Sequence, residues 1–216
     1  MTFSIPNRLA AVMLLVAISS PWERVMATEQ VPYAVERAIG TNIELRKYGP
    51  TVVAETLVDD ESFQQAGNSG FKLLAAYIFG ANRSREEIAM TAPVAMAPEQ
   101  GERIAMTAPV ARMPMPEGGW RMAFYMPAGY TLATLPVPND SRITLRNQPA
   151  RRVAALRFSG RGTDEQFAER TLELMQSLKT EGIVPVGQPW TARYNAPWVL
   201  PPLRRNEIII EVSSDD

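Results

Sequence analysis

The sequence of 216 residues contains no histidine and no cysteine. The lack of cysteine excludes disulfide bonds, thiolate metal sites and thiol nucleophiles. The lack of histidine excludes a Ser-His-Asp triad and the usual zinc sites, and it removes the commonest metal-binding side chain. Several large classes of catalytic and metal-binding protein are therefore ruled out by composition alone.

The charges are nearly balanced. Lys and Arg number 22 and Asp and Glu number 23, which gives a formal net charge of −1. A nucleic-acid-binding protein needs a basic face, so no nucleic-acid partner is expected. The hydrophobic share of 46% suits one soluble domain of ordinary size with a substantial core.

The first 27 residues have the pattern of an export signal. Arg8 precedes an apolar run over residues 9–18, and Val25-Met26-Ala27 offers a cleavage site. We expect a signal peptide over residues 1–27 and a single domain over residues 28–216. The run is short for a bilayer span, and no cysteine follows it as a lipid anchor, so no stable membrane anchor should remain after cleavage. The predicted location is the periplasm or the outside of the cell.

A phrase repeats within the chain: IAMTAPVAM over residues 88–96 returns as IAMTAPVAR over residues 104–112. Its alternation predicts two strands of a β-hairpin, with Pro93 and Pro109 at strand ends, bulges or edges. A further strand over residues 120–126 would bring Met122 beside Met90 and Met106. Such a methionine surface either fills the core or lines a pocket for a large flat ligand.

The remaining pattern alternates strands with two helices. Strands are expected over residues 33–37, 43–48, 51–57, 143–146, 152–158, 190–194 and 208–212. The first helix should begin near Asp59, be interrupted at Gly67 and Gly70, and end before Gly80. The second should begin with a capping box over residues 163–166 and end at Gly182. The order of strands, then a helix, then strands occurs twice along the chain. This repetition predicts two similar halves and an α+β fold.

Several phrases resemble one known family in order. They are Ile43 to Pro50, Gly70 to Asn82, Ile88 to Val94, Phe158 to Gly160, Tyr194, and Arg204 to Glu207. Over roughly residues 31–212 the chain resembles the SOUL or haem-binding protein family. The resemblance implies an α+β fold built as a distorted antiparallel β-barrel of two pseudo-symmetric halves with two long helices.

The resemblance also implies binding of haem or a related tetrapyrrole. We expect a monomer that binds this ligand without catalysis, as a carrier, buffer or scavenger. The family's ligand is thought to lie between the first helix and the loop before the last strand. The corresponding positions are Phe71, Leu74, Ala75 and Ile78 on the helix, and Tyr194, Trp198, Val199, Leu200 and Arg204 in the loop. An apolar slot accepts a porphyrin plane, and a nearby cation meets its propionates.

One position departs from the family pattern. Some members carry a proposed haem-ligating histidine where this chain has Lys47, so haem would bind without histidine ligation, through burial of apolar surface. Two other functions stay open: a binding module for other flat hydrophobic molecules, and an enzyme acting on haem. The phrase from Arg204 to Glu207 serves either the ligand or a structural ion pair.

Overall fold

The computed structural model describes residues 29–59, 63–84, 101–196 and 198–213. Two α-helices and a nine-stranded antiparallel sheet make up most of these residues, which confirms the α+β class. The helices are α1 (Phe63–Ile78) and α2 (Asp164–Thr180). In the described ranges, neither helix is long and apolar enough to cross a membrane.

The large sheet has the strand order β10-β4-β8-β7-β12-β13-β11-β3-β2. Its strands are β2 (Tyr33–Ile39), β3 (Ile43–Tyr48), β4 (Thr51–Val58), β7 (Val110–Pro114), β8 (Trp120–Tyr125), β10 (Ile143–Gln148), β11 (Arg151–Phe158), β12 (Pro185–Arg193) and β13 (Asn206–Val212). Two short pairs accompany it: β1 (Glu29–Gln30) with β6 (Thr107–Ala108), and β5 (Asn82–Arg83) with β9 (Val137–Pro138). The strands predicted outside the repeat are present in the described ranges, but residues 104–106 of its second copy form no strand and the copy is divided between β6 and β7.

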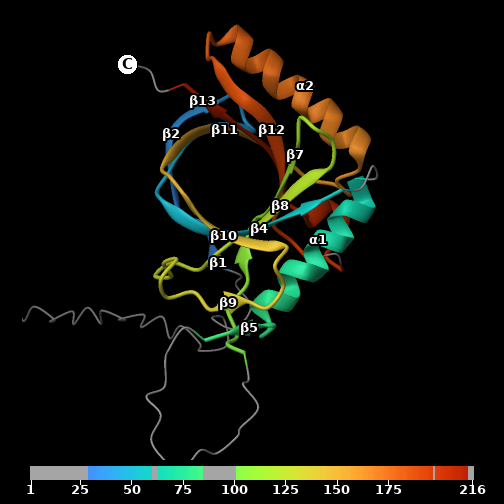
Figure 1. The fold of residues 1–216 in the computed structure, drawn as a ribbon. Coiled ribbons are helices and arrows are strands. Elements are labelled where there is room, and N and C mark those ends of the chain that lie inside the picture. The colour runs from blue at the N-terminus through green and yellow to red at the C-terminus, as the bar shows by residue number, and fades with distance from the viewer. Residues whose placement is uncertain (1–28, 60–62, 85–100, 197, 214–216) are drawn as a thin grey trace, which may run out of the picture.

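The sheet is strongly curved, and both helices lie on its outer side (Figure 1). Its edge strands are β10 and β2, and they form no ladder with each other in the part of the chain that the structure describes. The predicted closure into a barrel is therefore not confirmed.

The strand order repeats between two parts of the chain. The segment β4-α1-β7-β8 forms three adjacent strands, and β11-α2-β12-β13 forms the same arrangement beside it. The two meet where β7 pairs with β12. The strand before each unit is exchanged: β3 pairs with β11, and β10 pairs with β4. This is the topology expected of two similar halves.

Gly67 and Gly70 lie inside α1, so the predicted interruption of this helix is wrong. The helix packs too closely on the sheet for larger side chains. A Cβ atom at Gly67 would lie 2.7 Å from Nη1 of Arg112, and one at Gly70 would lie 3.1 Å from Sδ of Met122. Close packing against the sheet thus outweighs the low helix propensity of glycine. The helix ends before Gly80, whose φ of +114° suits a C-terminal stop.

Helix α2 begins as its sequence predicts. The Thr163 hydroxyl accepts from the backbone N–H of Gln166, and the Gln166 side chain accepts from the backbone N–H of Thr163. These reciprocal bonds satisfy N–H groups that have no partner within the helix. Gly182, with a φ of +70°, follows the helix as predicted.

Three apolar clusters divide the core. A helix-1 cluster joins α1 to one half of the outer face, with Leu74, Ile78 and Phe124 among its members. A helix-2 cluster joins α2 to the other half through Phe167, Leu174 and Leu178. An inner cluster on the concave face contains no helical residue and is rich in aromatic side chains: Tyr48, Tyr125 and Trp190, with Tyr33 and Tyr194 packed against it.

The second copy of the repeat bends at Pro109, which lies between β6 and β7. Proline thus marks a strand end, as predicted. Met122 is buried in the helix-1 cluster and Met106 packs against it, so these two methionines share one surface and fill the core. The first copy, with Pro93 and Met90, lies outside the described residues, and the predicted hairpin with it.

Candidate functional site

The predicted helix positions share one face of α1, and the sheet covers most of that face. Leu74, Ala75 and Ile78 are buried in the helix-1 cluster. Phe71 is 39% exposed, and its ring meets the edge of Phe124 at a centroid distance of 5.4 Å. Three of the four side chains therefore support the fold, and Phe71 is the one with open surface.

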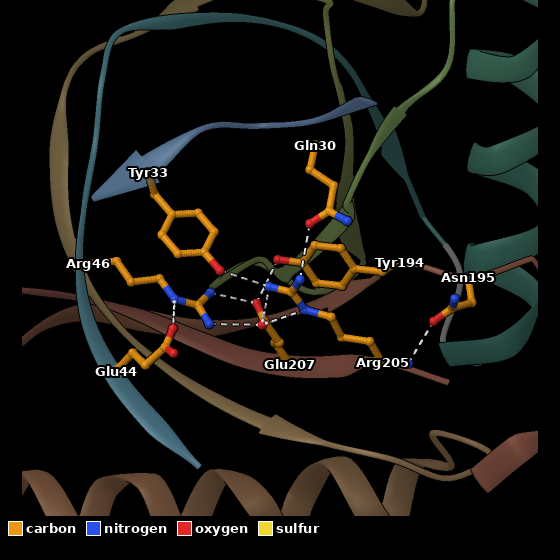
Figure 2. Close-up of polar contacts among 8 residues, drawn as sticks. All are labelled: Gln30, Tyr33, Glu44, Arg46, Tyr194, Asn195, Arg205 and Glu207. Atoms are coloured by element: carbon orange, nitrogen blue, oxygen red, sulfur yellow. Dashed lines mark hydrogen bonds and ion pairs between the residues drawn. The ribbon is translucent and has the colours of Figure 1, made fainter. Parts of the chain in front are cut away.

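The predicted loop positions lie between β12 and β13, in a proline-rich segment that includes the short 3-10 helix η2 (Pro201–Leu203). Trp198 is 83% exposed, Leu200 66% and Leu203 71%. Val199 is half-buried, and its carbonyl accepts from Nε of Arg204 at 2.7 Å. In both views the chain after Tyr194 approaches α1 (Figures 1 and 2). The loop thus presents large apolar side chains to solvent.

The two ends of this loop are fastened together on the concave face of the sheet. The backbone N–H of Tyr194 donates to the carbonyl of Arg205 at 3.3 Å, and the Arg205 guanidinium lies 3.9 Å from the centre of the Tyr194 ring. The Asn195 side chain accepts from the backbone N–H of Arg205 at 2.6 Å. The loop therefore leaves from a rigid stem.

Glu207 is the centre of that stem (Figure 2). It is fully buried, and both of its oxygens accept hydrogen bonds. Oε2 accepts from Nη1 of Arg46 at 2.8 Å and from the Tyr194 hydroxyl at 2.6 Å. Oε1 accepts from Nη2 of Arg46 at 3.0 Å and from Nη2 of Arg205 at 2.7 Å. The phrase from Arg204 to Glu207 thus contributes a structural ion pair, one of the two roles expected for it.

The network continues around the two arginines. Nε of Arg46 donates to Glu44 at 2.7 Å, and the Arg46 guanidinium lies 4.3 Å from the centre of the Tyr33 ring. Arg205 donates to Gln30 at 3.0 Å and to the Tyr33 hydroxyl at 3.2 Å. Residues from β1, β2, β3 and β13, together with Tyr194 just after β12, therefore meet around one buried carboxylate.

The buried charges stabilise one another. Burial alone would raise the pKa of Glu207, but the hydrogen bonds and charge of Arg46 hold the pKa of this carboxyl below its ordinary value. Burial opposes the charge of Arg46, yet the bonds to Glu207 raise the pKa of its guanidinium. Burial and the neighbouring Glu207 carboxylate raise the pKa of Tyr194. The Tyr194 hydroxyl thus stays protonated and donates a hydrogen bond to Glu207. A phenol that stays protonated is a poor anionic ligand for a metal.

Sequence reasoning missed Arg46 and Tyr33 as partners of the loop stem. Alternation placed Glu44, Arg46 and Tyr48 on one strand face, but it gave no sign that this face is the buried concave side. No group of three or more acidic side chains placed to hold a metal ion occurs in the described ranges.

Clefts of two sizes occur on the surface of the described ranges. The larger, the rim cleft, has a volume of about 730 Å³ and lies near the end of β3 and the start of β11, where Lys47, Arg151, Arg152, Glu36 and Glu211 line it. The smaller, of about 460 Å³, lies between the C-terminal half of α1 and the start of β10. Lys47, at the position of the family's proposed ligating histidine, therefore lines a cleft separate from the proline-rich loop.

Comparisons with known proteins agree on one family. The model described as SOUL heme-binding protein matches residues 28–211. Heme-binding protein 2 of Homo sapiens is 29% identical over 164 residues, which cover 76% of this chain and 74% of the human protein. The Mus musculus protein of the same name is 28% identical over 166 residues, covering 76% of this chain and 75% of its own.

Solved structures share the fold at low identity. The C-terminal domain of EcmrR has a TM-score of 0.58 at 12% identity, covering 82% of this chain and 100% of that one. A hydrolase from Listeria innocua has a TM-score of 0.53 at 11% identity, covering 89% and 96%. These likenesses show the architecture alone, whereas the family model spans most of the sequence. The chain belongs to the SOUL heme-binding protein family.

Proposed function

We propose that this protein binds haem or a related tetrapyrrole on the surface formed by the proline-rich loop and Phe71, without catalysing a reaction. The observation that carries this proposal is the exposure of Trp198, Leu200 and Leu203 on one loop whose stem is held by hydrogen bonds to the buried Glu207. Large exposed apolar side chains held on a rigid base are typical of a binding surface. Membership of a family described by heme binding supports a tetrapyrrole as the class of ligand.

Each side chain would have a defined part in such a complex. The Trp198 ring offers a flat apolar face to a macrocycle, and Leu200 and Phe71 extend the apolar surface. Arg204, at the end of the loop, supplies a cation for the propionates. Leu74, Ala75 and Ile78 would support the site by holding α1 against the sheet.

The residues fit a tetrapyrrole better than they fit a coordinated iron. The chain has no imidazole, and the Tyr194 hydroxyl donates to Glu207. Binding would therefore rest on apolar burial, and iron-free porphyrin would bind about as well as haem. Weak dependence on the metal suits a carrier, buffer or scavenger.

Absorbance titration of the protein with haem, with iron-free porphyrin and with an unrelated flat dye tests this proposal. Saturable binding of both tetrapyrroles, with much weaker binding of the dye, is the expected result. Equal binding of the dye would instead favour a module for flat hydrophobic molecules in general. Absence of any saturable tetrapyrrole binding would refute the proposal.

We further propose that the protein acts outside the cytoplasm as a monomer. The apolar run after Arg8 and the cleavage site at Ala27 support export. Mass spectrometry of the cellular fractions should find a chain that begins near Thr28. An intact chain in the cytoplasm would contradict this.

A further inference from the structure

The rim cleft gathers positive charge from neighbouring strands. Lys47 on β3 and Arg152 on β11 are direct partners in the antiparallel ladder. Residues that face each other in this way have Cβ atoms only about 4.5–5.5 Å apart, and like charges so placed destabilise a sheet. Nε of Arg152 donates to Glu36 at 2.6 Å, which offsets part of this repulsion.

Arg151 adds a third cation to the same cleft. Its side chain is only 8% exposed, and Nη1 lies 3.8 Å from Oε1 of Glu211. Nη2 donates to the Tyr125 hydroxyl at 2.5 Å. Nε of Arg151 is buried and has no hydrogen-bond partner among the described residues. A buried donor without an acceptor is costly, so an acceptor supplied by a ligand would be stabilising.

The charges that line the cleft do not cancel. Three basic side chains face two carboxylates, and one carboxylate is tightly paired with Arg152. The rest of the wall comes from small apolar residues, Ala150, Val186 and Val212. Val186 is 48% exposed although it is apolar. An inorganic anion would leave this apolar wall uncovered, whereas an organic anion would cover it.

We propose that the rim cleft binds a small organic carboxylate, with its carboxylate between Lys47 and the two guanidinium groups and its hydrocarbon body against Val186. The carboxylate would relieve the repulsion across the β3–β11 ladder and supply acceptors to Lys47 and Arg151. This site is separate from the proposed tetrapyrrole surface and does not depend on it.

Saturation-transfer NMR with hexanoate on the full chain tests this site, with hexan-1-ol and inorganic phosphate as matched probes. Hexanoate should bind more tightly than either probe. Lys47→Gln should weaken hexanoate binding roughly tenfold, because one charge-assisted hydrogen bond is lost. Lys72→Gln, which changes an exposed lysine on α1, should have no effect.

Three results would overturn the proposal: no saturable binding of hexanoate, equal binding by the Lys47→Gln protein, or tighter binding of phosphate than of hexanoate. Unchanged thermal unfolding of the Lys47→Gln protein shows that any loss is local. Saturating hexanoate should leave a haem titration unchanged. Competition between the two would place the tetrapyrrole in the rim cleft and contradict the separation of the sites.

Discussion

The N–H of Tyr194 donates to the carbonyl of Arg205, and the Arg205 guanidinium covers the Tyr194 ring at 3.9 Å. Tyr194 directly follows β12 and Arg205 directly precedes β13, so these two residues flank the proline-rich loop. The buried carboxylate of Glu207 bonds to both of them. The loop that carries Trp198 is therefore fixed at its base and open at its tip.

Replacing Glu207 by Gln should cost about 3–5 kcal/mol of unfolding free energy, because the buried Arg46 and the partly buried Arg205 lose their shared counter-charge. Urea denaturation measures this loss. Glu117→Gln, at an exposed glutamate, is the control and should change stability by less than about 0.5 kcal/mol. A similar small change for Glu207→Gln would show that the network does not stabilise the fold.

The same carboxyl should contribute to acid unfolding. The pKa of Glu207 in the folded protein lies below its ordinary value of 4.5. The unfolded chain therefore takes up this proton first as the pH falls, so the contribution is complete above the ordinary value and is lost below it. Urea midpoints measured between about pH 3 and 7 should fall less steeply for Glu207→Gln than for the wild type. Parallel curves would exclude this linkage.

Two residues on one face of α1, Leu74 and Phe71, allow a role in the core to be distinguished from a role in ligand binding. Leu74→Ala should destabilise the protein by about 2–5 kcal/mol, because Leu74 is fully buried against the sheet. Phe71→Ala should cost less stability and should weaken tetrapyrrole binding, since Phe71 has open surface. Thermal unfolding and haem titration of both variants measure these effects. Loss of binding without loss of stability in Leu74→Ala would mean that the ligand reaches beneath the helix.

Lys47 should not coordinate iron. Its side chain is exposed and lines the rim cleft, and an ammonium group must lose its proton before it can donate to a metal. Lys47→Ala should leave the Soret band of a haem complex nearly unchanged. A shifted band together with lower affinity would identify this lysine as a ligand.

Local patterns in the sequence predicted much of the fold. The capping box at Thr163 and the alternation that predicted strands over residues 43–48 and 120–126 depend on neighbouring residues, and the structure confirms the cap and both strands. The prediction that Gly67 and Gly70 interrupt the helix was wrong. Glycine occurs at these positions because the helix lies close to Arg112 and Met122 on the sheet, and no local pattern reveals such a contact.

The candidate site was harder to predict. An apolar stripe such as Leu74 and Ile78 indicates a covered face, but it does not tell whether a sheet or a ligand covers it. The pairing of Arg46 with Glu207 joins residues 161 positions apart. Such pairing follows from strand order, which a single sequence does not specify. The exposure of Trp198 likewise depends on how the loop stem is held.

The most direct test of tetrapyrrole binding at the loop is a haem titration of Trp198→Ala, followed by absorbance and tryptophan fluorescence. A large aromatic contact is worth on the order of 1–3 kcal/mol, so affinity should fall roughly tenfold to a hundredfold, and much of the fluorescence quenching by haem should disappear. Met106→Leu, a volume-conserving change beside the helix-1 cluster, should bind as the wild type does. Binding that survives in Trp198→Ala but is lost in Met106→Leu would place the ligand among the methionines and contradict the account.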